Sequence, residues 1–343
     1  MIVPGALLVY AFLLLVVVAP AFSRARWPDR APRLAIAGWL ALTGTAIASV
    51  VLAGLSLAVP AADVTTSLAR LIMTCARLLR LQYAHPGGAP LSMAGAFVAL
   101  IAMSRLGWCM TRTLAQSALA RHRHGRGLTL AGRQDHRLGA IVVDHHDPAA
   151  WCLPGAGRPV VITTAAISAL DYRQLAAVLA HERAHQNGRH HLLVAVAGSI
   201  ASAFPLLAFL TSHEQITRLV ELLADDAAAA TSPRLAVAEA ILALAAPARA
   251  TAALSAGGPD TAARVRRLLA APRTLTRPAV LASALAIAVI AAAPVVIAAG
   301  PAVQVIGKPC PTPAKRAEAR QHSVTRGQVV LARPLPDRAE RNA

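Results

Sequence analysis

The sequence predicts a polytopic α-helical membrane protein that carries an inserted α+β domain. Its 343 residues are 56% hydrophobic and only 15% charged, with a mean hydropathy of +0.53, whereas soluble domains carry about 25% charged residues. The chain also contains four long apolar runs, and between the third and the fourth the composition changes to histidine-rich segments with short β-branched stretches. This composition excludes an intrinsically disordered chain.

The four apolar runs are long enough to cross a bilayer, because a spanning helix needs about 20 mostly apolar residues. Arg105 interrupts the third run, and its long side chain could extend to the headgroup region. The first run could instead be a cleaved signal peptide, but it lacks a basic segment and exceeds the usual apolar core of such peptides. The predicted spans cover about residues 3–22, 34–60, 91–110 and 278–301.

Arginine-rich loops predict the orientation. Four arginines lie within residues 24–33, after the first run, and seven lie within 105–137, at and after the end of the third. Because cytoplasmic loops are enriched in Lys and Arg, we expect both loops inside the cell and the N-terminus outside, in a multi-pass protein of the plasma membrane. The same topology places residues 302–343 outside, although this short tail carries eight Lys or Arg, so its side stays open.

The net charge of +18 raises the question of a nucleic-acid partner. However, the basic residues are arginines apart from Lys308 and Lys315, they flank apolar runs, and no aromatic-rich nucleic-acid-binding motif accompanies them. We therefore expect the lipid bilayer, and not nucleic acid, as their partner. The four cysteines form no CxxC pair, which argues against a disulfide framework and a thiolate zinc site.

The inserted domain is predicted to begin with two strands and a capped helix. Residues 141–143 and 159–163 are rich in β-branched residues, and Pro159, which lacks an N–H group, favours an edge position for the second strand. In the following helix Asp171 is the expected N-cap, and Gln174 completes a capping box. The pair Asn187-Gly188 is expected to end this helix.

This predicted helix carries the motif His181-Glu182-Arg183-Ala184-His185, which has the pattern HExxH. Residues four apart lie on one face of a helix, so both imidazoles can reach a single Zn²⁺ ion. Glu182 then lies beside the position of a metal-bound water, where a carboxylate can accept a proton as the water attacks a carbonyl. The motif predicts a zinc-dependent hydrolase with Glu182 as the catalytic base.

A second helix, predicted from Ser212 as N-cap, would supply the third zinc ligand. Glu221 and Asp225 share one face of it, and no Lys or Arg follows at the spacing that would neutralise them. Because a buried carboxylate needs a partner, we assign Glu221 as the third ligand and Asp225 as the hydrogen-bond acceptor of a ligating histidine, with His181 as the expected donor. A solvated acidic face is the alternative, and Asp226 is expected at the surface.

The uncharged run 192–212 lies between these two helices and contains Pro205. A straight crossing would separate the two motifs by about 30 Å, whereas one zinc ion must contact both. The run is therefore expected to form either a membrane-dipping or interfacial hairpin bent near Pro205, or a buried core helix.

The remaining histidines have weaker predictions. We expect those at 190, 191 and 213 to be loop or interfacial residues, with oxyanion stabilisation as the alternative. His145 and His146 are expected to form a polar turn in preference to a second metal site.

The segments AAVLAHERAHQNGRHHLL and VELLADDAA resemble the integral-membrane gluzincin zinc metallopeptidases. They are most similar to the beta-lactam-sensor (BlaR/MecR-type) family, and next to the heat-shock HtpX-type proteases, over roughly residues 120–230. The resemblance implies a zincin-like metalloprotease domain that cleaves peptide bonds on the cytoplasmic side, with His181, His185 and Glu221 as zinc ligands and Glu182 as the base. Only 42 residues follow residue 301, so the extracytoplasmic penicillin-binding domain of the antibiotic sensors is not expected.

The predicted function is a membrane-embedded, zinc-dependent endopeptidase that acts on a protein or peptide substrate in regulation or quality control. The resemblance adds a transcriptional repressor as a candidate substrate, and the strand 159–163 could hold an extended substrate by edge pairing. The alternative is a catalytically silent membrane sensor or scaffold that retains the zinc fold, against which the presence of Glu182 argues.

The chain is expected to divide into five regions. Residues 231–277 are predicted to be helical and to form either a substrate gate or an anchor on anionic lipid. The regions are an N-terminal membrane region 1–110, a zinc metallopeptidase domain 111–230, a juxtamembrane region 231–277, a last span 278–301 and a basic tail 302–343.

Overall fold

The structure is a computed structural model, and it describes residues 2–58, 88–153, 160–251, 258–271 and 274–306. Most of the predicted tail therefore lies outside the described residues, as does Pro159. The helical elements are α1 (Ile2–Leu13), η1 (Leu14–Val18), α2 (Ala19–Arg24), η2 (Pro28–Arg30), α3 (Pro32–Ala58), α5 (Gly88–Ala131), α6 (Thr164–Ala169), α7 (Tyr172–Asn187), α8 (His190–Ala203), α9 (Leu207–Ala229), α10 (Arg234–Thr251), α11 (Gly258–Leu269) and α12 (Arg277–Ile306). The strands are β1 (Gly132–Asp135), β2 (Ala140–Val143), β3 (Ala150–Cys152) and β4 (Val160–Thr163).

Four helical stretches of the described chain are long and apolar enough to cross a membrane, and each overlaps one predicted span. The third of them belongs to α5, which continues to Ala131, well beyond the predicted end at residue 110. The additional residues are rich in Ala, Leu and Arg, which favour helix, and contain no proline to end it. The candidate spans are Ile2–Arg24, Pro32–Ala58, Pro90–Leu119 and Arg277–Ala299.

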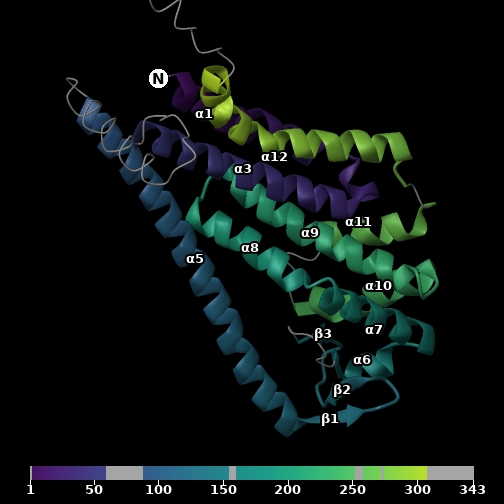
Figure 1. Cartoon of the computed structure of the whole chain (residues 1–343). Helices are drawn as coiled ribbons and strands as arrows, with labels where there is room; N and C mark the ends of the chain where they lie inside the picture. Colours follow the sequence, from purple (N-terminus) through teal and green to yellow (C-terminus); the bar gives the residue numbers. More distant parts are fainter. Residues whose placement is uncertain (1, 59–87, 154–159, 252–257, 272–273, 307–343) are drawn as a thin grey trace, which may run out of the picture.

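Helix α3 lies at the centre of the helical layer. It packs against α1, α5, α9 and α12, and Figure 1 shows α12, α3, α9 and α8 side by side, with α5 running diagonally past them down to β1. Trp39 and Leu42 of α3 are almost completely buried, together with Ile216 and Leu219 of α9. Burial of large apolar side chains on both helices fixes α9, and hence the position of Glu221, against a candidate span.

The run 192–212 folds as a helical hairpin made of α8 and the start of α9, with its bend at residues 204–206 around Pro205. The predicted N-cap at Ser212 is wrong: α9 begins at Leu207, and Ser212 is buried within it. Pro205 breaks the chain before the apolar residues that open α9, so no second break is needed at Ser212. Arg105 of α5 donates a hydrogen bond to the carbonyl of Ala203 at the end of α8.

The four strands form one sheet of order β1-β2-β4-β3, in which β4 is parallel to β2 and antiparallel to β3. The prediction that residues 159–163 form an edge strand is therefore wrong, because β4 has a neighbour on each side. All four of its residues are buried, as is typical of a central strand with consecutive apolar residues. The outer strand beside β4 is β3, and it contacts α7.

The helices after the two motifs fold back onto them. Helix α10 packs on α7, and α11 packs on α10 and α9. The region 231–277 therefore contributes directly to the surroundings of the predicted site.

Candidate active site

Helix α7 positions three of the predicted site residues. The Asp171 side chain accepts a hydrogen bond from the amide of Gln174, and the Gln174 side chain accepts one from the amide of Asp171, which completes the expected capping box. Leu175, Val178 and Leu179 are buried in the core that includes β2 and β4. This packing holds the helix on the sheet and leaves the face with the HExxH residues toward α9.

The structure brings His181, His185 and Glu221 together. The two Nε2 atoms lie 3.1 Å apart. The Glu221 oxygens lie 3.4 Å from Nε2 of His185 and 3.6 Å from Nε2 of His181. One ligand atom from each residue lies within 4.8 Å of the other two, so the group could hold a metal ion. Tetrahedral zinc with bonds of about 2.0–2.2 Å requires ligand atoms roughly 3.3 Å apart, so both the donor types and their spacing fit Zn²⁺.

Asp225 contacts the far side of His181. Its Oδ1 lies 3.1 Å from Nδ1 of His181, and the residue has no exposed surface. Burial alone would raise the pKa of Asp225, but hydrogen bonds from Arg264 and His181 outweigh it and hold the pKa below its usual value. The contact leaves Nε2 of His181 facing His185 and Glu221, as metal coordination would require.

The second imidazole of the motif also has a partner, His190, for which the sequence predicts a loop or interfacial position, or a role in oxyanion stabilisation. Nδ1 of His190 lies 3.0 Å from Nδ1 of His185, and His190 is only 6% exposed. Arg189 has φ 48°, the left-handed conformation that turns the chain back between α7 and α8. A Cβ atom on Gly188 would overlap the ring of His190, so the local sequence leaves space for this contact.

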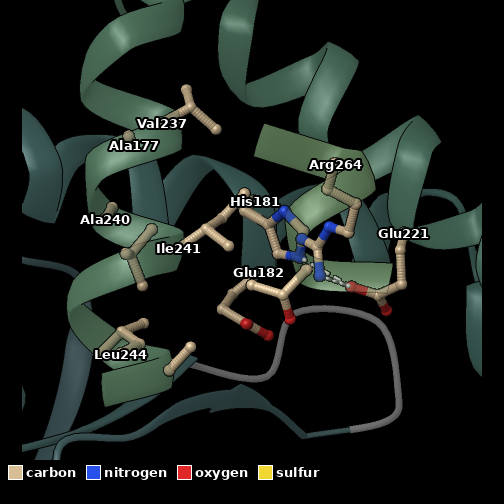
Figure 2. A pocket seen from close by; sticks show the side chains of 12 residues that line it. Ala177, His181, Glu182, Glu221, Val237, Ala240, Ile241, Leu244 and Arg264 are labelled. Carbon is tan, nitrogen blue, oxygen red and sulfur yellow. Dashed lines mark ion pairs between the residues drawn. The ribbon is translucent and has the colours of Figure 1, made fainter. Parts of the chain in front are cut away.

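Arg264 of α11 is a site residue that the sequence did not predict. Its Nε and Nη2 donate to the two Asp225 oxygens at 2.8 and 2.7 Å, and Nη1 lies 3.0 Å from Oε2 of Glu221 (Figure 2). No local signal indicates this contact, because Arg264 lies 39 residues beyond Asp225. The acidic pair on α9 therefore has a cationic partner that comes from a separate helix.

Asp226 was expected at the surface, but it is paired. Nη1 and Nη2 of Arg267 each donate to one of its oxygens at 2.7 Å. Arg267 also donates to the backbone carbonyl of Asp29, in the segment that precedes α3. Two arginines of α11 thus bind two adjacent carboxylates of α9 and hold the helix in place.

Glu182 points into a cavity of about 250 Å³ that His181 and Glu221 also line. Figure 2 shows Ile241 and Leu244 of α10 on the other side of this space. Burial raises the pKa of Glu182 to about 7, while the charge of His181 and hydrogen bonding to Cys152 oppose this shift. The carboxylate is thus a base with a pKa close to neutrality, the range that suits a general base.

Two further groups could in principle bind a metal ion: Cys152, and the cluster of His145, His146 and Asp147. Burial, followed by the charge of Glu182, raises the pKa of the Cys152 thiol to about 11, so it stays protonated and is not a thiolate ligand. His145, His146 and Asp147 lie close enough to hold a metal ion, but all three are exposed. The Asp147 amide donates to Nδ1 of His145, which is the geometry of a polar turn.

Part of the chain matches a known protein family. Residues 120–271 match the family model described as peptidase family M48. The matched range runs from the last part of α5 to the end of α11, so it includes both predicted motifs and Arg264. It indicates a metallopeptidase in this part of the chain. No curated protein and no solved structure matched the chain.

Proposed function

We propose that the protein is a membrane-embedded, zinc-dependent endopeptidase that hydrolyses peptide bonds of a protein substrate. The observation that supports this most directly is the convergence of His181, His185 and Glu221, from two helices, beside the carboxylate of Glu182. The match to peptidase family M48 supports the metallopeptidase activity, and the four long apolar helices support a location in the membrane.

The residues would divide the chemistry among them. His181, His185 and Glu221 would hold a Zn²⁺ ion, which when bound supplies a Lewis acid that lowers the pKa of water and polarises a carbonyl. Glu182 accepts the proton of the attacking water and delivers it to the leaving amine. Asp225 and His190 orient the two imidazoles, and Arg264 keeps Glu221 ionised and in place.

The substrate would approach along β3. This strand is the outer member of the sheet next to α7, and its last residue, Cys152, is close enough to Glu182 to influence the pKa of that carboxyl group. An extended peptide that pairs with a strand edge presents its backbone in a defined register. The domain would face the cytoplasm, where a transcriptional repressor or a membrane protein in quality control is a candidate substrate.

The proposal is tested with the full-length protein purified in detergent. We expect about one zinc ion per chain in the wild type and in Glu182→Gln, and cleavage of a generic unfolded protein by the wild type alone. His181→Asn and Glu221→Gln should lose zinc as well as activity. Glu214→Gln is a matched control, because Glu214 is an exposed carboxylate on the same helix as Glu221. Equal cleavage by the wild type and Glu182→Gln would contradict the assignment and would favour a silent scaffold.

A further inference from the structure

A second cavity of about 840 Å³ begins at the predicted metal ligands and extends away from Glu182. It is an open groove lined by residues of α5, α8 and α9 and by Cys152 of β3. We call it the hairpin groove. Its lining begins at His185 and Glu221 and ends at Pro205 and Leu210, at the bend of the hairpin.

The length of the groove corresponds to a short peptide. On α9 its lining runs from Glu221 to Leu210, which are eleven residues apart and therefore roughly 16 Å apart along the helix. An extended chain advances about 3.3 Å per residue. The groove therefore has the length of about five extended residues on one side of the scissile bond.

The lining of the groove combines small or apolar side chains with isolated polar groups. Val194, Gly198 and Ala201 of α8 provide the apolar part. Nδ1 of His213 is buried and has no hydrogen-bond partner among the described residues. The ring lies against Gly198, where an added Cβ atom would lie 3.3 Å from its Cε1. Because His213 also lines the groove, a small rotation of its ring would give a ligand there access to an unpaired imidazole nitrogen.

The third wall indicates where that ligand comes from. Thr113 and Ser117 of α5 line the groove, and both lie within the candidate span Pro90–Leu119. A membrane-inserted helix must unwind before one of its peptide bonds can be cleaved. Both residues are close to the end of that span, and unwound backbone at the membrane boundary needs hydrogen-bond partners that lipid does not supply. The hydroxyl oxygens of α5 could accept such hydrogen bonds, and the imidazole of His213 also lines the groove.

We propose that the hairpin groove binds about five extended, apolar residues from a membrane-inserted segment of the substrate, and that His213 hydrogen-bonds to their backbone. The inference rests on the proposed function and specifies its substrate class. It assigns substrate-binding roles to His213 and Gly198, which lie outside the metal site.

The cleavage test uses the full-length protein in liposomes and two substrates with the same cleavable apolar segment. In one the segment adjoins a transmembrane helix, and in the other it is part of a soluble carrier. We expect the wild type to cleave the anchored substrate with a kcat/KM at least tenfold higher. His213→Leu should lower that value at least tenfold, whereas His213→Asn, which keeps a polar group near the position of Nδ1, should retain at least half of it.

Gly198→Leu should also reduce cleavage of the anchored substrate at least tenfold, because its side chain would occupy the groove. Gly107→Leu is the matched control, since Gly107 lies on α5 outside the groove lining and an added Cβ there meets nothing within 4 Å. The proposal would be overturned if His213→Leu and Gly198→Leu cleaved the anchored substrate with the kcat/KM of the wild type. It would also be overturned if the wild type cleaved both substrates equally well.

A photo-crosslinking arm tests occupancy of the groove without depending on catalysis. In the Glu182→Gln background, a photoreactive residue replaces Ser202, which lines the groove, or Gly107 as the control. Crosslinking of the anchored substrate at residue 202 and not at residue 107 would support binding of the substrate in the hairpin groove, even if the wild type is inactive. No crosslink at 202 overturns it, and if cleavage still depends on Glu182, the proposed peptidase function stands.

Discussion

Nδ1 of His185 lies 3.0 Å from Nδ1 of His190, which is buried at the start of the next helix. If Nε2 of His185 binds a metal ion, its proton is on Nδ1 and is donated to His190. Burial lowers the pKa of both rings, to about 4 for His185, so His190 is neutral and can accept this proton. The contact therefore corresponds to the one that Asp225 makes with His181 on the other side of the site.

The first prediction concerns this contact. His190→Leu should weaken zinc binding about 10–100-fold, the usual loss when the partner of a ligating histidine is removed. His190→Asn places an amide oxygen near the position of Nδ1 and should restore most of the affinity. The measurement is competition with a zinc chelator, together with the visible spectrum of the Co²⁺-substituted protein, which reports the coordination geometry.

Gly188→Ala tests the same contact from the backbone, because its Cβ atom would displace the ring of His190. It should lower zinc affinity as His190→Leu does. The control is His136→Leu, at an exposed histidine in the turn after β1. Unchanged affinity and an unchanged Co²⁺ spectrum in both His190→Leu and Gly188→Ala would show that His190 does not position the ligand.

The second prediction concerns Arg264, which binds Glu221 and both oxygens of Asp225. Arg264→Met leaves Asp225 buried without its cation, and breaking a buried ion pair costs about 3–5 kcal/mol. We expect a lower melting temperature in detergent and loss of cleavage. Arg264→Lys should recover little, because an ammonium group cannot form the paired hydrogen bonds to Asp225.

Arg266→Met is the control for Arg264. It removes an exposed arginine of the same helix, which among the described residues donates a hydrogen bond to the backbone carbonyl of Ala262. The double variant Arg264→Met with Asp225→Asn should be more stable than the sum of the two single losses predicts. Additive losses would argue that the two side chains do not interact energetically.

The local parts of this site could be predicted from the sequence. The spacing of His181 and His185, and that of Glu221 and Asp225, is readable because both pairs lie within single helices, where residues four apart share a face. The cap of α7 is equally local. The acidic pair also has the partners that a buried carboxylate needs, but these include Arg264, whose position depends on α11 folding back on α9.

Features that depend on tertiary packing could not be predicted. His190 is separated from its motif by the break at Gly188, so its direction cannot be read from helical periodicity. Pro159 suggested an edge strand, yet β4, which follows it, pairs with β2 on one side and with β3 on the other, and these neighbours depend on how the chain folds back. The expected cap at Ser212 failed because Pro205 had already set the start of α9.

The third prediction concerns pH. Glu182 must be ionised to accept a proton, and burial raises its pKa to about 7. A Zn²⁺ ion beside Glu182 favours the ionised carboxylate and lowers this pKa, so kcat/KM should be level at and above about pH 7 and fall at lower pH, approaching tenfold per pH unit. Zinc content is measured at each pH, because protonation of His181 would also reduce metal binding. A rate that is constant between pH 5 and 8 at full zinc occupancy would rule out Glu182 as the base.

The fourth prediction concerns removal of the metal. A zinc ion bound by His181, His185 and Glu221 would link α7 to α9. It would stabilise the folded state by a free energy that increases with the ratio of the free zinc concentration to Kd. At a free zinc concentration of about 1,000 times Kd this amounts to about 4 kcal/mol. A chelator should therefore lower the melting temperature of the wild type, and added zinc should restore it. Glu182→Gln should respond in the same way, whereas His185→Asn should not respond to either treatment. An equal response of the wild type and His185→Asn would place the stabilising ion elsewhere in the protein.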